Sequence, residues 1–204
     1  AYEIRNCDWS SDVCSSDLIA PDAEIEFTPV YLTEENLTTY ALDCDVAVNA
    51  LDFSTSVPFL FDCYYVGKNI PVLHPYNFGW IGCVFVIRTL TSEWLKWEQF
   101  EGKTEVAVAR FVMSRLEKKT DEWDAFAKVV DAYENEKETL PPPQLAIGSY
   151  YVAGMCTSIL CKISSQDRLC DFPEFNVVPV NDFFMCFPML LGRNESLNLF
   201  VAKR

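Results

Sequence analysis

The sequence predicts an α/β fold in which a mostly parallel β-sheet is flanked by helices. Candidate strands at 24–31, 45–51 and 70–73 alternate with candidate helices, and a further strand follows at 83–87. This order is typical of strands joined by crossover helices, which run parallel to one another. The 204 residues are 50% hydrophobic and 14% aromatic, which suffices for the packed core of one domain.

The first candidate strand, at 24–31, alternates apolar and polar residues, and Pro29 places it at a sheet edge or at the strand end. Thr33 is then expected to cap a short helix. The apolar run at 45–51 has the length and β-branched content of a central strand. These two strands and the helix between them begin the alternating pattern.

The next elements are a helix and two buried strands. Ser and Thr at 54–56 offer N-caps for a helix that runs to about Gly67. The runs at 70–73 and 83–87 are the buried strands, and 74–80 is expected to be the loop between them. Most of these strands are expected to run parallel to one another.

Residues 92–135 are expected to be helical and amphipathic, because apolar side chains recur at three- and four-residue steps. A charged stretch at 136–143 ends in three prolines and separates this region from a further helix that begins near Gln144. The last strand is expected at 174–180, followed by an apolar segment at 183–191.

The helix that begins near Gln144 has two interpretations. No Asp, Glu, Lys or Arg occurs from Thr139 to Cys161, which is compatible with a transmembrane span. However, its Gly, Ser, Thr and Tyr residues make it only weakly hydrophobic. We therefore expect a buried core helix, and no membrane association.

Residues 1–18 are excluded from the predicted fold. They show neither helical nor strand periodicity, and the run from Asp8 to Leu18 is similar to the translation of a sequencing-library adapter. The opening AYEI matches the other arm of the same primer, so Arg5 and Asn6 would be an index barcode. We expect the biological chain to begin near Ile19 and to be truncated upstream. The alternative is a natural Ser-rich tail.

The net charge restricts the expected partners. The chain has 30 Asp and Glu residues against 16 Lys and Arg, a formal net charge of −14 at pH 7. Binding to nucleic acid depends mostly on neutralising phosphates, so nucleic acid is not an expected partner.

Several short motifs occur in a characteristic order. The triplet Ala50-Leu51-Asp52 ends a predicted strand, Gly67 and Ile70-Pro71 follow the next helix, and Gly82 precedes a further strand. This segment resembles the ThiF/MoeB/HesA family of adenylyltransferases, relatives of ubiquitin-activating enzymes. The Pro-rich entry to a long helix at 141–160 is a second match.

The resemblance covers most of residues 19–180. It implies a Rossmann-like fold, incomplete at its N-terminus, in which 19–204 is the C-terminal portion of a ThiF-type domain. Residues 88–143 would then form the helical insertion or crossover region. It also implies a homodimer.

The resemblance also implies an activity. Members of this family use ATP and Mg²⁺ to convert the C-terminal carboxylate of a ubiquitin-like or sulfur-carrier protein into an acyl-adenylate. Asp52 is carried over as the Mg²⁺ ligand, at the carboxyl end of a predicted strand, where open α/β sheets bind ligands. The alternative role for Asp52 is to cap the next helix.

The segment from His74 to Trp80 follows another strand end and is expected to face the same crevice. His74, Tyr76 and Asn77 would then line the nucleotide or carboxylate-tail site. The alternative is a well-packed aromatic loop.

The chain departs from the family pattern in five respects. The Gly-rich phosphate-binding turn is absent, Val57 stands where Arg is common, and Phe61 stands where Asn is common. No Cys occurs at 88–143, where thioester-forming members carry their nucleophile, so no catalytic residue is assigned. No CxxC pair offers a structural zinc site, and free thiols suit a reducing cytoplasm.

Three functions follow from these observations. The first is ATP-dependent adenylylation of a carrier protein, and the second is a non-catalytic binding or partner module on the same fold. Val57, Phe61 and the absent Cys favour the second function. A dinucleotide-dependent oxidoreductase is the weakest, because no Gly-rich turn with a following acidic strand end is visible.

Overall fold

The computed structural model describes residues 22, 24, 28–53, 55–79, 81–99, 104–115, 121–135 and 145–179. The chain divides into two compact units, 1–32 and 33–204. In the first unit, the described residues of the expected strand at 24–31 form no strand, and residues 25–27 lie outside the described part. The elements named below all belong to the second unit, as do most of the described residues.

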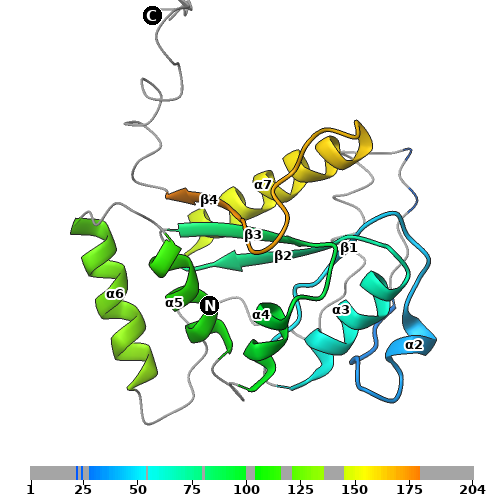
Figure 1. The fold of residues 1–204 in the computed structure, drawn as a ribbon, viewed down its shortest axis with the longest axis horizontal. Coiled ribbons are helices and arrows are strands. Elements are labelled where there is room, and N and C mark those ends of the chain that lie inside the picture. Colours follow the sequence, from blue (N-terminus) through cyan, green and yellow to red (C-terminus); the bar gives the residue numbers. More distant parts are fainter. Residues whose placement is uncertain are drawn as a thin grey trace, which may run out of the picture. The chain divides into compact units, whose positions relative to one another are not determined.

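The second unit is a mixed α/β structure with an open sheet of four strands (Figure 1). The strands are β1 (Ala47–Val48), β2 (Val72–Asn77), β3 (Ile81–Ile87) and β4 (Asn176–Pro179). The helices are α2 (Leu37–Tyr40), α3 (Val57–Gly67), α4 (Ser92–Leu95), the 3₁₀ helix η1 (Lys96–Gln99), α5 (Thr104–Arg115), α6 (Asp121–Glu134) and α7 (Ala146–Ser164).

The strand order is β1-β2-β3-β4, and only the β1–β2 pairing is parallel. β2 pairs antiparallel with β3, and β3 pairs antiparallel with β4. The prediction of a mostly parallel sheet is therefore not confirmed for the described strands. The expected α/β class is confirmed, and so is the parallel β1–α3–β2 unit.

The expected loop at 74–80 is the main error, because its first four residues extend β2. The chain then turns back at Gly79, whose φ of 76° suits glycine, and Phe78 N donates to Ile81 O at 2.9 Å. Pro75 is tolerated inside β2 because its backbone faces the β1 side of the sheet, beyond the point where β1 ends. A hairpin buried on both faces has the same continuous apolar runs as two parallel strands.

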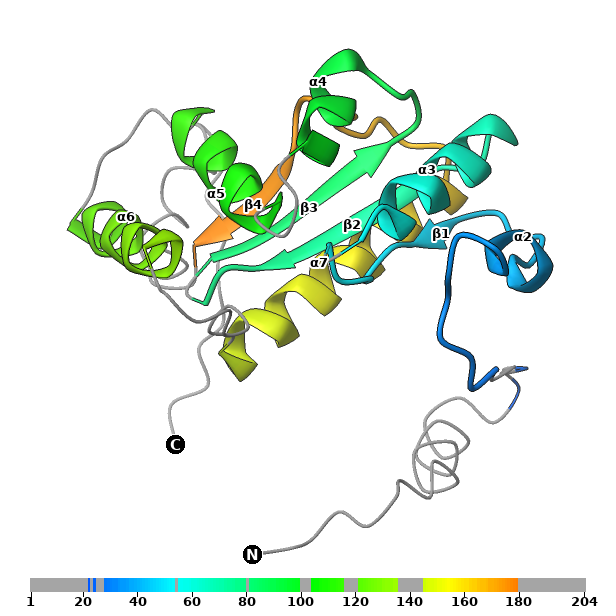
Figure 2. The same ribbon diagram turned by 90° about the horizontal axis from the view of Figure 1, so that it is seen from below.

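Helices cover both faces of the sheet (Figures 1 and 2). On one face, Val72, Phe85 and Ile87 pack in a core with side chains of α3, α4 and α5. On the other face, Leu73, Val84 and Val86 pack against Val152 and Ile159 of α7. Burial of both sheet faces explains why β2 and β3 lack the polar alternation of a half-exposed sheet.

The helical predictions hold in most places. The helix expected to end at Gly67 ends there, with Pro58 in its first turn, and 92–135 contains α4, η1, α5 and α6. A short helix follows Thr33, but it begins at Leu37 with Asn36 as its N-cap.

The buried core helix expected near Gln144 is buried along one side only. α7 is buried at Gly148, Val152 and Ile159, which face the sheet, whereas Tyr150 is 81% exposed. By length and composition α7 is the one helix in the described ranges that could cross a membrane. In this structure it packs with one side on β2 and β3.

Candidate functional site

A cluster of polar side chains is buried at the centre of the second unit. Asp62 of α3 is fully buried, and its Oδ1 lies 2.7 Å from His74 Nε2 and accepts a hydrogen bond from Asn49 Nδ2 at 2.9 Å. Its Oδ2 accepts a hydrogen bond from Trp94 Nε1 at 2.8 Å. Three donors satisfy this one carboxylate, and their hydrogen bonds offset the free-energy cost of burying it.

Each member of the cluster comes from a different element. Asn49 directly follows β1, Asp62 lies on α3, His74 on β2 and Trp94 on α4. The rings of Trp94 and His74 meet edge to face, with centroids 4.5 Å apart. The cluster therefore ties the parallel β1–α3–β2 unit to α4.

His74 and Tyr76 lie two residues apart on β2, so both point to the same face of the sheet, toward the aromatic core. His74 is fully buried and Tyr76 is 6% exposed. Among the described residues, His74 Nδ1 and the Tyr76 hydroxyl have no hydrogen-bond partner. Burial, and then the charges of Asp62 and Glu105, raise the pKa of Tyr76 well above its usual range, so it stays protonated.

Asn77 points to the opposite face, toward the start of α7. Its Nδ2 donates to Leu145 O at 3.0 Å and to Ser149 Oγ at 2.8 Å, and its Oδ1 accepts from Gly79 N at 2.9 Å. These bonds join the hairpin turn to α7. The structure thus places Asn77 away from His74 and Tyr76.

Asp52 is exposed, in the loop that leads from the carboxyl end of β1 to α3. Among the described residues its carboxylate has no hydrogen-bond or ion-pair partner, so it does not cap α3. One free carboxylate fits Mg²⁺ bound to a nucleotide, because that ion commonly takes one or two carboxylates together with phosphate oxygens. A metal site made of protein groups alone does not fit, since the described residues include no cluster of three His, Cys, Asp or Glu.

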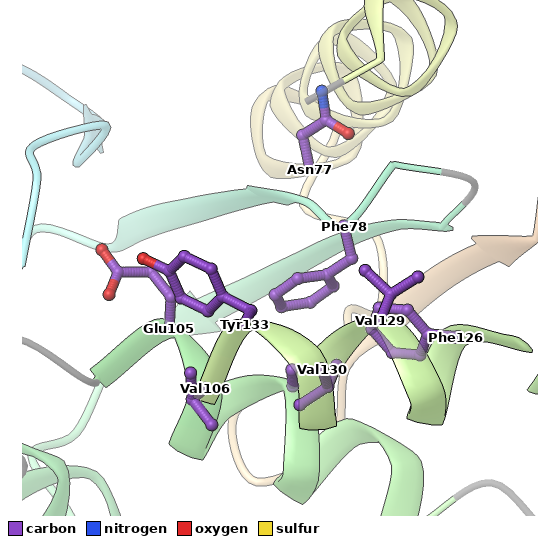
Figure 3. A pocket seen from close by; sticks show the side chains of 9 residues that line it. Asn77, Phe78, Glu105, Val106, Phe126, Val129, Val130 and Tyr133 are labelled. Carbon is purple, nitrogen blue, oxygen red and sulfur yellow. The ribbon is translucent and has the colours of Figure 1, made fainter. Parts of the chain in front are cut away.

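A small pocket lies beyond the turn of the hairpin, between it and α5 and α6 (Figure 3). Its volume is about 50 Å³, and its lining is mostly apolar. Phe78 from the turn meets Phe126 of α6, with ring centroids 5.8 Å apart. A pocket of this size is well below the several hundred Å³ that a nucleotide-sized ligand needs.

Several cysteine thiols of the described residues have a raised pKa. Burial raises the pKa of Cys83 far above its usual range. Partial burial and then Asp45 raise the pKa of Cys44, and partial burial and then Asp62 raise that of Cys63. These three thiols are protonated at neutral pH and are poor nucleophiles.

The two departures at the start of α3 are packing residues. Val57 is 7% exposed and belongs to the buried side of the helix. Phe61 is half-buried, and its ring lies 4.6 Å from that of Tyr65. Neither position presents a polar group to the loop that holds Asp52.

Asp62, Asn49 and Trp94 were not predicted from the sequence as members of a site. The available signal was Asp62 itself, the only charged residue in the apolar helix α3. A charged residue in such a helix is buried only when it is paired, and His74 was the single histidine to pair with it.

Comparison of the chain with models of protein families, with curated proteins and with solved structures gave no match. The assignment of function therefore depends on the residues and their geometry.

Proposed function

We propose that this chain is part of a ThiF-type, Rossmann-like adenylyltransferase that activates the C-terminal carboxylate of a ubiquitin-like or sulfur-carrier protein. The observation that carries the proposal is the position of Asp52, an exposed carboxylate with no polar partner among the described residues, at the carboxyl end of the parallel β1–β2 pair. Ligands of open α/β sheets bind at this edge. The motif order around Asp52 supports the same family.

Asp52 would hold one Mg²⁺ ion together with the phosphates of ATP. The ion supplies positive charge that neutralises the phosphates during attack by the carrier carboxylate. The remaining phosphate contacts belong to the Gly-rich turn, which the resemblance places before Ile19. His74 and Tyr76 are buried in the core and therefore do not line this edge.

The first test is ATP–pyrophosphate exchange in the natural chain, with the residues that precede Ile19 restored. We expect exchange with a co-encoded carrier protein, and Asp52→Ala should abolish it because the metal loses its protein ligand. Asp45→Ala is the matched control, since Asp45 is also exposed but lies at the opposite, amino end of β1. Absence of exchange in the restored wild type would refute the enzymatic function.

A second expectation concerns the 204-residue chain itself. It should bind ATP weakly or not at all, because the Gly-rich phosphate-binding turn of the family is absent from its sequence. The net charge of −14 also opposes a polyphosphate. Isothermal titration calorimetry measures this directly, and micromolar binding would contradict the expectation.

The second candidate function is a non-catalytic partner module on the same fold. The burial of Val57 and the packing of Phe61 favour it, since these positions contribute no polar group to the loop. Such a module would bind a carrier protein or a catalytic partner without exchanging pyrophosphate. Carrier binding by a restored chain that shows no exchange would support this function.

A further inference from the structure

The backbone on both sides of Asp52 is held by buried groups. Before it, Asn49 Oδ1 accepts a hydrogen bond from Leu51 N at 3.3 Å. After it, Phe53 is only 6% exposed, and its ring lies 5.3 Å from that of Phe59. These contacts fix the backbone at Asp52 and hence the direction in which its side chain leaves the chain, although its carboxylate has no hydrogen-bond or ion-pair partner among the described residues.

The amide of Asn49 can satisfy its neighbours in one orientation only. Its Nδ2 donates to Asp62 Oδ1 and to Pro58 O, each at 2.9 Å, and both of these atoms are acceptors. The amino group must therefore face them, which leaves Oδ1 facing the N–H of Leu51. A flipped amide would place its oxygen against two acceptors and its amino group against a donor.

Phe53 is fixed by the same region of the core. Its ring stacks on Tyr76 with an interplanar angle of 15° and lies 6.0 Å from His74. His74 is in turn bound to Asp62. The residues before and after Asp52 thus depend on one buried cluster.

We propose that Asn49, oriented by Asp62, and Phe53 are positioning residues for Asp52. They fix the β1–α3 loop so that the exposed carboxylate is held in the direction required to bind a metal ion with its nucleotide. This inference rests on the proposed function, because it assumes that Asp52 is the metal ligand. Groups that orient a metal ligand without touching the metal commonly change its affinity.

The test uses the restored natural chain with three variants. Asn49→Ala removes the bond to Leu51 N, and Phe53→Leu removes the ring contacts on the other side of Asp52. Trp94→Phe is the matched control: it removes a donor to the same carboxylate of Asp62, at 2.8 Å, but leaves Asn49 and Leu51 in place. Thermal unfolding of each variant establishes that it is folded.

Two measurements report on metal binding. The first is the Mg²⁺ concentration that gives half-maximal pyrophosphate exchange. The second is independent of activity: Mn²⁺ is added with ATP but without carrier protein, and the paramagnetic broadening of the Asp52 backbone amide is recorded by NMR.

We expect Asn49→Ala and Phe53→Leu to raise the Mg²⁺ requirement by about tenfold or more and to weaken the Mn²⁺ broadening. Trp94→Phe should leave both unchanged, even where it lowers the unfolding temperature. If Asn49→Ala does not fold, Phe53→Leu makes the same comparison from the other side of Asp52.

Two results would overturn the inference. In one, the folded positioning variants keep the wild-type Mg²⁺ requirement although Asp52→Ala abolishes exchange. In the other, Trp94→Phe raises the requirement as much as they do, which would indicate general loosening of the core. Failure of the proposed function gives different results, namely no exchange in the restored wild type, or exchange and Mn²⁺ broadening that persist in Asp52→Ala.

Discussion

Replacing Asp62 with alanine is expected to lower the free energy of unfolding by about 3–5 kcal/mol, because each buried donor left without an acceptor costs about 1–3 kcal/mol. The substitution leaves His74 Nε2, Trp94 Nε1 and Asn49 Nδ2 without their acceptor. All of these donors are buried, so water does not replace the carboxylate. Because domains are stable by only about 5–15 kcal/mol, this variant is expected to be close to unfolding at 37 °C.

Urea unfolding followed by tryptophan fluorescence measures the effect. Asp43→Ala is the control: Asp43 also forms an ion pair, at 3.0 Å from Lys68 Nζ, but its side chain is 94% exposed. Exposed pairs contribute about 0–1 kcal/mol, so the two aspartates should differ several-fold. Equal losses for both variants would contradict the assigned role of Asp62.

Asp62→Asn separates the loss of acceptors from the loss of volume. The asparagine side chain has nearly the same shape, but it offers one oxygen and an amino group where aspartate offers two oxygens. One of the two edges at Asp62, toward Trp94 or toward His74 and Asn49, must then face a donor. We expect this variant to lie between wild type and Asp62→Ala in stability.

The sequence predicted those elements whose signals are local. α3 carries hydroxyl residues before its start and a glycine at its end, and 92–135 carries a helical apolar period, so both were found. The direction of β3 was not predicted correctly, because an apolar run looks the same in a parallel and in an antiparallel strand. The turn at Gly79 reverses the chain and makes β3 antiparallel to β2, but the sequence pattern indicated only a longer loop there.

The candidate site was predicted only in part for a similar reason. The position of Asp52 after a strand follows from local sequence, and the structure places it there, exposed. The orientation of His74 and Tyr76 depends on β2 continuing through Asn77, which local sequence did not indicate. Once these residues lie on a strand, alternation sends two of them into the core and Asn77 to the other face.

Replacing Gly148 of α7 with alanine is expected to destabilise the protein by about 2–4 kcal/mol, because the core cannot accept the added methyl group. A Cβ atom there would overlap Asn77 Oδ1 and would lie 2.5 Å from the backbone oxygen of Gly79. Asn77 cannot move aside without losing its bonds to Leu145 and Ser149. Figure 3 shows Asn77 on the side of the hairpin that faces α7.

Gly154→Ala is the matched control on the same helix, and its effect should have the opposite sign. Among the described residues, no heavy atom outside the adjoining turns of α7 lies within 4 Å of a Cβ at this position, so the change gains helix propensity, about 0.5–1 kcal/mol, without a clash. Urea unfolding of the two variants therefore tests the packing of α7 on the hairpin. If α7 instead left the sheet, as a membrane span would, both alanines would be tolerated alike. Opposite signs thus require α7 to be seated on β2 and β3 in solution.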